Sequence, residues 1–188
     1  MKKIALFGTS ADPPTAGHNA ILRWLSQRYD LVAVWASDNP FKSHQTSLEH
    51  RVKMLEVLID SLEDKYHNVN LHQKFSNRRT LETVKQARQV WGDLPELTLV
   101  IGSDLPPQMS SWYGIKELLP QVLLLVIPRP GYPIKEQDLA ALDNLGGKCA
   151  IADFHPPSVS STAYREYQDP NAVIPSVKDY IQREQLYI

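Results

Sequence analysis

The sequence lacks most of the features that would assign a chain of 188 residues to a class at once. It contains one cysteine, Cys149, which cannot form an internal disulfide, so a reducing compartment is expected. Its longest apolar run, residues 122–127, is far below the ~20 residues that cross a bilayer. The apolar run before Gly8 is too short for the core of a signal peptide. These absences predict a cytoplasmic protein that has no membrane among its partners.

The charge of the chain is nearly balanced, with a formal net charge of −1 at pH 7. Proteins that bind nucleic acids usually neutralise many phosphates with a broad basic face, and the composition offers no such excess of lysine and arginine. A small anionic ligand needs only a few local donors. Nucleic acid is therefore not expected as a partner, whereas a site for a small phosphorylated molecule stays open.

Common site motifs are also missing. No Gly-Lys-Ser or Gly-Lys-Thr follows Gly8, which excludes a Walker A loop. Gly8 and Gly17 are too far apart for the G-x-G-x-x-G fingerprint of dinucleotide-binding folds. The six histidines show no ligand spacing with Cys149, so no metal site built from protein ligands is expected.

The sequence does contain a regular alternation of short apolar runs and amphipathic segments. Strands are predicted at residues 3–7, 31–36, 69–72, 97–101, 122–127 and 150–154. Helices are predicted at residues 17–29, 48–62, 80–91, 112–119, 160–167 and 173–185. This alternation predicts an α/β fold, a Rossmann-like, doubly wound, mainly parallel sheet with helices on both faces. No repeat or linker divides the chain, so a single domain is expected over residues 1–188, with a C-terminal helical part at about 156–188 packed on it.

In a sheet of this kind, ligands bind at the carboxyl ends of the strands, near the point where the strand order reverses. The segments that should meet there are residues 8–18, 39–42, 102–104 and 128–131. Within the first of them, Gly8 lets the backbone approach a ligand, and Thr15 and Gly17 fall at a helix start, where phosphate is attracted. His18 then presents a donor to the same phosphate. The alternative is an ordinary helix start, with Thr15 as N-cap and His18 as a surface residue.

Here the sequence resembles a known family. Residues 14–18, Pro-Thr-Ala-Gly-His, are similar to the (H/T)-x-G-H signature of the nucleotidyltransferase superfamily, and the preceding Gly-Thr and Asp-Pro-Pro resemble the nicotinate-nucleotide adenylyltransferases. Further segments resemble that family in the same order along nearly the whole chain. They are residues 39–42, 49–55, 79–84, 101–104, 112–119, 128–132, 160–165, 177–181 and 186–187.

The resemblance implies transfer of the AMP moiety of ATP to nicotinate mononucleotide, which gives the dinucleotide and diphosphate in the biosynthesis of NAD. Mg²⁺ is expected to be carried by the ATP phosphates, and a homo-oligomer is an option that the sequence leaves open. The implied catalytic residues are His18, Thr15 and Arg165. The implied ATP-binding residues are Gly8, Thr9, Ser10, Gly17, His18, Lys42, Gly102, Asp104, Ser160, Ser161, Thr162 and Arg165. The implied acceptor-binding residues are Thr80, Thr83 and Trp112.

Each implied role has a plainer alternative. Lys42 could be a solvated loop lysine, and Asp104 could form an Asx-turn or cap a short helix instead of binding the ribose. Trp112, which would stack on the pyridine ring, could be a core aromatic. Capping alone would explain Thr80. Residues 160–165 could be a helix cap followed by a surface arginine.

The sequence departs from the family pattern at three places. Thr15 stands where the usual signature has its first histidine, as in relatives that use phosphopantetheine. Ser10 and Ala11 make the first loop one residue longer, and residues 76–79 replace a Gly-Pro-Ser-Tyr run near the expected acceptor site. The alternatives are therefore nicotinamide mononucleotide or phosphopantetheine as acceptor, or a non-catalytic module that binds nucleotides and regulates.

Overall fold

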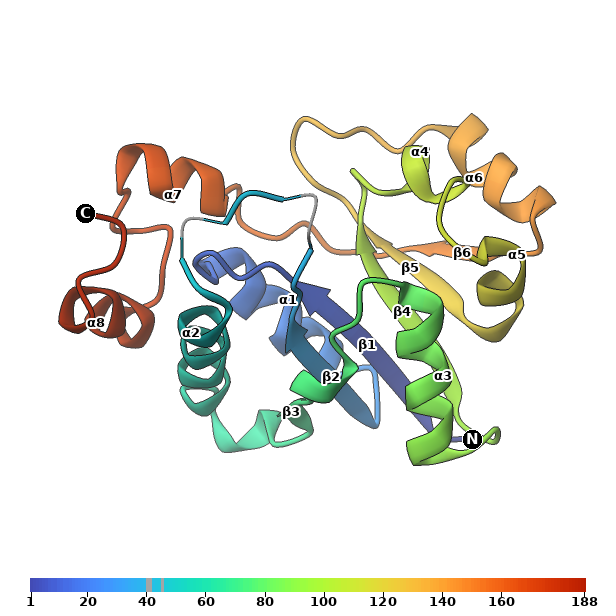
Figure 1. The fold of residues 1–188 in the computed structure, drawn as a ribbon, viewed down its shortest axis with the longest axis horizontal. Helices are drawn as coiled ribbons and strands as arrows, with labels where there is room; N and C mark the ends of the chain where they lie inside the picture. The colour runs from blue at the N-terminus through green and yellow to red at the C-terminus, as the bar shows by residue number, and fades with distance from the viewer. Residues whose placement is uncertain (40–41, 45) are drawn as a thin grey trace.

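The computed structural model describes residues 1–39, 42–44 and 46–188 of the chain (Figure 1). Within them the strands form one sheet in the order β3-β2-β1-β4-β5-β6, and every neighbouring pair is parallel. The strands are β1 (Lys3–Thr9), β2 (Leu31–Ala36), β3 (Val69–Leu71), β4 (Glu96–Gly102), β5 (Leu123–Ile127) and β6 (Lys148–Ile151). The prediction of a doubly wound α/β domain with a parallel sheet is confirmed.

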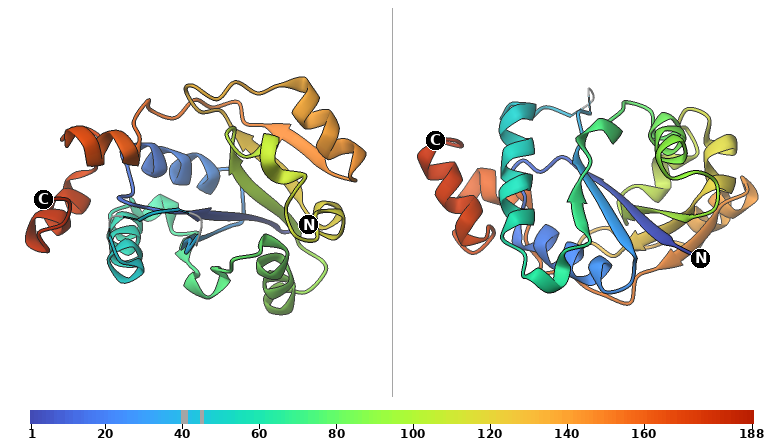
Figure 2. Two further views of the ribbon diagram at one scale, coloured as in Figure 1. Left: turned by 45° about the horizontal axis from the view of Figure 1, so that its top comes forward. Right: turned by 90° about the horizontal axis from the view of Figure 1, so that it is seen from below.

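Helices cover both faces of this sheet (Figure 2). The longer ones are α1 (Ala16–Ser26), α2 (Leu48–Asp60), α3 (Thr80–Trp91), α6 (Glu136–Asn144), α7 (Ser161–Tyr167) and α8 (Pro175–Arg183). The shorter ones are α4 (Pro106–Met109) and α5 (Ile115–Leu118), with 3-10 turns η1 (Asp64–Tyr66), η2 (Gln73–Phe75) and η3 (Leu119–Gln121). No helix among the described residues is long and apolar enough to cross a membrane.

The strands divide their side chains between two buried clusters because successive residues of a strand point to opposite faces. In β1, Ala5 and Phe7 join the cluster that also contains the apolar faces of α1, α2 and α8. Ile4 and Leu6 join the other cluster, with α3, α5 and α6. Both faces of β1 are therefore buried, which explains why the strand is a continuous apolar run.

The strand order reverses beside β1, which lies between β2 and β4. Both neighbours run parallel to β1, so all three strands end at the same edge of the sheet. The loops that follow Thr9, Ala36 and Gly102 meet at this edge, as predicted for the carboxyl ends of a doubly wound sheet.

The element boundaries differ from the prediction in the second half of the chain. The helix predicted at 112–119 begins only at Ile115, because Gly114 takes the left-handed backbone conformation with φ 64°. The last strand is Lys148–Ile151 rather than 150–154. Helix α6 was not predicted, since Leu142 is its only fully buried apolar residue and its apolar periodicity is weak.

Helices α7 and α8 lie beyond α2, at the side of the molecule opposite to β6 (Figure 1). Val177, Tyr180 and Ile181 of α8 are buried, and the Tyr180 hydroxyl lies 2.9 Å from Nδ1 of His50 on α2. The predicted C-terminal helical part therefore packs on the rest of the domain and shares its core.

Candidate active site

The loop between β1 and α1 lies at the reversal point of the sheet, between the ends of β2 and β4. Its backbone is closely surrounded. A Cβ atom on Gly8 would lie 2.6 Å from the indole of Trp35, and one on Gly17 would lie 3.3 Å from the Thr15 hydroxyl. Ser37 N donates to Thr9 O at 2.8 Å and extends the β1–β2 pairing into the loop. The loop is therefore held against the carboxyl edge where a ligand would bind.

Thr15 and His18 form a capping box at the start of α1. The Thr15 hydroxyl is the N-cap group that accepts from His18 N, and the imidazole of His18 takes the place of the usual Glu or Gln by accepting from Thr15 N at 2.9 Å. The other ring nitrogen, Nε2, lies 2.8 Å from Thr9 Oγ1. Thr15 is thus the N-cap of α1, as the alternative expected, and this cap fixes the direction of the imidazole.

The same contacts define the protonation state of His18. Nδ1 accepts from the Thr15 amide, so it carries no proton, and we assign the proton of the neutral ring to Nε2. Burial, with a smaller contribution from the positive charge of Arg129, lowers the pKa of His18 to about 4. His18 is thus a neutral imidazole at physiological pH, and its Nε2–H is aimed toward Thr9.

The N–H groups at the start of α1 are mostly engaged within the protein. Thr15 N donates to the His18 ring, Ala16 N donates to Ala172 O at 2.8 Å, and His18 N contacts the Thr15 hydroxyl. These N–H groups are therefore not open to a phosphate in this conformation, contrary to the expectation from the sequence. Thr15 itself is 2% exposed, and its hydroxyl contacts the His18 ring.

The end of β4 presents a carboxylate and a guanidinium side by side. Asp104 Oδ1 lies 3.1 Å from Arg129 Nη1, and Arg129 N donates to the Ser103 hydroxyl at 2.8 Å. A Cβ atom on Gly102 would lie 2.5 Å from Asp104 Oδ1 and 2.9 Å from Arg129 Cδ, so a larger residue here would displace these two side chains. Arg129 was not among the predicted site residues; the available signal was its position just after β5, at the same edge of the sheet.

The start of α7 contacts the loop between β1 and α1. Ser160 caps α7 by accepting from Ala163 N at 3.0 Å. The Ser161 hydroxyl donates to Pro13 O at 2.7 Å, and Arg165 Nη1 donates to Asp12 O at 2.7 Å. Thr162 is exposed and accepts from Arg165 Nη2 at 3.3 Å. Of these four predicted residues, Ser161 and Arg165 donate to the backbone of the β1–α1 loop, and Ser160 and Thr162 contact their own helix.

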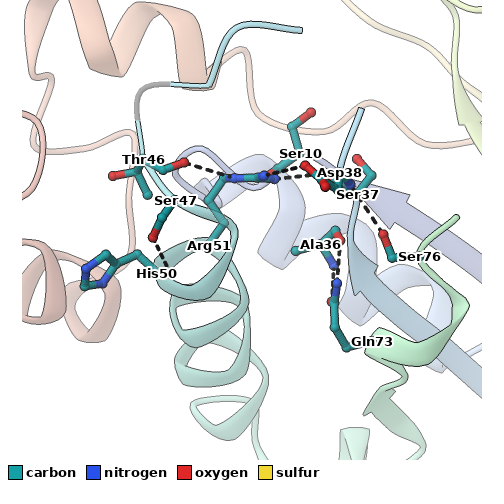
Figure 3. Close-up of polar contacts among 10 residues, drawn as sticks. All are labelled: Ser10, Ala36, Ser37, Asp38, Thr46, Ser47, His50, Arg51, Gln73 and Ser76. Carbon is teal, nitrogen blue, oxygen red and sulfur yellow. Dashed lines mark hydrogen bonds and ion pairs between the residues drawn. The ribbon is translucent and has the colours of Figure 1, made fainter. Parts of the chain in front are cut away.

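Arg51 on α2 joins the ends of β1 and β2, as Figure 3 shows. Arg51 is 1% exposed, and its Nη1 donates to Ser10 O at 2.9 Å and to Ser37 O at 2.7 Å. Its Nε donates to Thr46 O at 3.3 Å, and its Nη2 lies 3.7 Å from Asp38 Oδ1. Burial lowers the pKa of Arg51 from its ordinary value, and Asp12 and Asp38 oppose that shift.

The β2–α2 loop carries Lys42, which is exposed and whose N–H donates to Asn39 O. Pro40 and Phe41, part of the predicted 39–42 segment, lie outside the described residues. The start of the loop is held by Gln73, which accepts from Ala36 N at 2.9 Å and donates to Ala36 O at 2.8 Å (Figure 3). Lys42 is therefore available to solvent close to the strand ends.

The predicted acceptor residues lie on two neighbouring segments. Thr80 is the first residue of α3, but the N-cap is Arg79, which makes no capping bond through its side chain, so capping does not explain Thr80. Thr83 is buried, and its hydroxyl donates to Phe75 O at 2.7 Å. Trp112 is half-buried against the α3 side of the core.

The segment that contains Trp112 packs directly against the start of α3. A Cβ atom on Gly114 would lie 2.4 Å from Leu81 Cδ2, and the Arg79 guanidinium lies 3.9 Å from the ring centre of exposed Tyr113. Trp112 and Thr80 thus belong to adjoining parts of the surface. Thr83 contacts protein atoms instead, so its predicted contact with the acceptor stays a prediction.

The chain is similar to known proteins over nearly its whole length. Residues 6–167 match the model of the cytidylyltransferase-like family. A protein of Synechocystis sp. (strain ATCC 27184 / PCC 6803 / Kazusa), named probable nicotinate-nucleotide adenylyltransferase, is 46% identical over 197 residues, 98% of each chain. The nicotinate-nucleotide adenylyltransferase of Bacillus subtilis (strain 168) is 28% identical and is covered over 99% of its length.

Among solved structures, Plasmodium falciparum nicotinic acid mononucleotide adenylyltransferase complexed with NaAD has a TM-score of 0.82 at 22% identity. The match covers 100% of this chain and 98% of that one. At this identity the likeness shows the fold alone.

The fold and the family model define the class first: the chain is a nucleotidyltransferase of the cytidylyltransferase-like family. Within that class it belongs to the nicotinate-nucleotide adenylyltransferases, with which it shares nearly its full length.

Proposed function

We infer that this protein transfers the AMP moiety of ATP to nicotinate mononucleotide and forms nicotinate adenine dinucleotide and diphosphate. The observation that carries the inference is the 46% identity to a nicotinate-nucleotide adenylyltransferase across 98% of both chains. The geometry supports it, because a neutral histidine, held by a capping box with its Nε2–H toward Thr9, lies at the reversal point of the sheet.

In this reaction a phosphate oxygen of the acceptor attacks the α-phosphorus of ATP. The bond between the α-phosphorus and the bridging oxygen breaks, and diphosphate leaves with the electron pair. No protein nucleophile is needed, so catalysis depends on positioning and on neutralising charge. The site is suited to that task because its polar groups are donors held by other protein groups.

We propose that His18 donates from Nε2 to a phosphate oxygen, exchanging its contact with Thr9 for the ligand. Gly8, Thr9, Ser10 and Gly17 would line the same phosphate pocket. Arg165 adds a positive charge beside the loop, and exposed Lys42 would contact the triphosphate from the β2 side. Thr15 orients His18. Ser160, Ser161 and Thr162 would complete the pocket at α7.

On the β4 side, Asp104 would accept from the ribose hydroxyls of the adenosine, with Gly102 giving the nucleotide close access to the backbone. The ion pair with Arg129 directs the Asp104 carboxylate. Trp112, with Thr80 and Thr83 on the adjoining helix, would bind the pyridine nucleotide. The half-buried position of Trp112 supports this role, since a stacking platform needs one ring face packed and one open.

Mg²⁺ is proposed to enter with ATP. Among the residues that the structure describes, no group of three or more His, Cys, Asp and Glu could hold a metal ion. Mg²⁺ keeps several waters and takes few protein ligands, so the ATP phosphates would supply its other ligands. Bound in this way, the ion supplies charge neutralisation on the triphosphate. A cytoplasmic location and a homo-oligomer stay predictions.

The test is release of diphosphate from ATP and Mg²⁺ with each acceptor in turn. Nicotinate mononucleotide should give the highest kcat/KM, with nicotinamide mononucleotide and phosphopantetheine far behind. A higher kcat/KM with either of those two would show that it, and not nicotinate mononucleotide, is the preferred acceptor. ATP binding without diphosphate release in every reaction would indicate the non-catalytic module.

A further inference from the structure

Tyr187, near the far end of the chain, contacts the phosphate loop through a single buried hydrogen bond. Its hydroxyl donates to Asp12 Oδ1 at 2.6 Å across 175 positions of sequence. Asp12 is 2% exposed and Tyr187 is 8% exposed, so the bond is shielded from water. A hydrogen bond to a charged acceptor in such surroundings is among the stronger ones in proteins.

The position of Tyr187 is itself determined by several contacts. Gln168 Nε2 donates to Tyr187 O at 2.6 Å, and the ring packs edge-on against Tyr164 with 5.9 Å between centroids. Its backbone has a φ of 60°, a conformation that bulky residues seldom adopt without support from their surroundings. Tyr187 is thus held by α7 and the residues that follow it.

Other contacts from residues 161–187 reach the same loop at its backbone. Ser161 contacts Pro13 O, Arg165 contacts Asp12 O, and Ala172 O accepts from Ala16 N. Among these contacts the Tyr187 hydroxyl is the one that fixes the Asp12 side chain. Burial and the neighbouring Asp12 raise the pKa of Tyr187, so its hydroxyl remains a donor throughout the physiological range.

We propose that Tyr187 is a positioning residue for the nucleotide: its hydroxyl fixes Asp12 and thereby holds the loop from Thr9 to Thr15 in the conformation that directs His18 toward the triphosphate. The proposal rests on the proposed ATP site. It differs from a purely structural role because it predicts a change in nucleotide affinity and turnover in a protein that remains folded.

Tyr187→Phe tests this by removing the hydroxyl and keeping the ring. The matched control is Tyr164→Phe, which removes the hydroxyl of the other ring in the same pair and leaves Asp12 untouched. We expect the Kd of ATP to rise about 10-fold in Tyr187→Phe and kcat to fall, with the KM for nicotinate mononucleotide unchanged. Tyr164→Phe should match the wild type in all three constants. Equal constants in the two variants, or a loss confined to thermal stability, would overturn the proposal.

A double-mutant cycle checks the pathway through Asp12. In an Asp12→Ala background, which removes the acceptor, Tyr187→Phe should not weaken ATP binding any further, whereas additive effects would contradict the coupling. Affinity is measured with ATP and Mg²⁺ and no acceptor. Wild-type protein that binds ATP but turns over no acceptor would overturn the proposed reaction alone, and a Tyr187→Phe affinity equal to the wild type would overturn the positioning role alone. A wild type that does not bind ATP would overturn both.

Discussion

At the scale of single residues, the proposed chemistry depends on one neutral imidazole and the groups that orient it. Both ring nitrogens of His18 have partners. Nδ1 contacts the amide and the hydroxyl of Thr15, and Nε2 contacts the hydroxyl of Thr9. The ring therefore has a fixed direction and a fixed proton position. A charged histidine would lose the bond from the Thr15 amide. His18 is therefore proposed to act as a hydrogen-bond donor at Nε2 and not as a titrating acid.

His18→Asn should lower kcat by about 10²-fold, since removal of one donor to a developing charge has effects of that size. The Asn oxygen can still accept from the Thr15 amide, so the start of α1 is preserved while the Nε2 donor is lost. Steady-state kinetics at saturating ATP measure the effect. His155→Asn, at an exposed histidine, is the matched control and should behave as the wild type. An unchanged kcat in His18→Asn would place the phosphate site elsewhere.

Variants of Thr15 test whether the orientation of the His18 ring matters apart from its Nε2 donor. Thr15→Val removes the hydroxyl next to His18 Nδ1 and keeps the side-chain shape, so kcat should fall about 10-fold, less than in His18→Asn. Thr15→Ser keeps the hydroxyl and should retain most of the activity. Both variants are compared by kcat at saturating substrates. Equal activity of the Val and Ser variants would show that the hydroxyl has no part in orienting the ring.

At the scale of helices and strands, the sequence predicted those elements whose apolar pattern is regular. The strands 3–7, 31–36 and 97–101 were placed within one or two residues, because their residues are buried on both faces. Strand β6 lies at the sheet edge, where its residues are partly exposed, and the apolar pattern there is weak. Helix α6 was missed for the same physical reason.

Contacts between elements could not be predicted in this way. Nothing in the segment around Arg51 indicates that its guanidinium binds the carbonyls of residues 10, 37 and 46, because those contacts exist only after β1, β2 and α2 have packed. The sequence predicted which loops share an edge, and the structure adds the groups that connect them. The same holds for the ion pair of Asp104 with Arg129.

Arg51→Lys tests whether this connection supports the site. Lysine keeps the charge but cannot reach three carbonyls with a planar group, so the KM for ATP should rise about 10-fold. Arg88→Lys is the control: Arg88 also donates to four carbonyls, those of residues 92, 93, 95 and 121, which lie beside the starts of β4 and β5. Both variants should lower the melting temperature, but only Arg51→Lys should change the KM. Equal KM values would limit Arg51 to stability.

At the scale of the whole molecule, both halves of the chain contribute to the candidate active site. The first loop comes from residues 8–18, while the groups that hold it include Arg51 from α2 and Ser161, Arg165 and Tyr187 from the last part of the sequence. The site and the global fold are therefore coupled, and conditions that protonate the site should also reduce stability.

The pH dependence of stability follows from the lowered pKa of His18. The unfolded chain takes up a proton near pH 6.5, but the folded protein does so only near pH 4, so the free energy of unfolding decreases as the pH falls through that window. At pH 5 the loss is about 2 kcal/mol relative to pH 8. Urea unfolding of wild type and His18→Asn at both pH values measures the difference. The variant should lose less; an equal loss would mean that His18 keeps an ordinary pKa.

The central claim is transfer of the AMP moiety, and isotopic labelling of ATP tests it most directly. With nicotinate mononucleotide and Mg²⁺, label in the α-phosphate should appear in nicotinate adenine dinucleotide, and label in the γ-phosphate should appear in diphosphate. The His18→Asn variant should form both products about 10²-fold more slowly. Label from the γ-phosphate in the acceptor product, or α-label that remains in free nucleotide while diphosphate accumulates, would contradict adenylyl transfer.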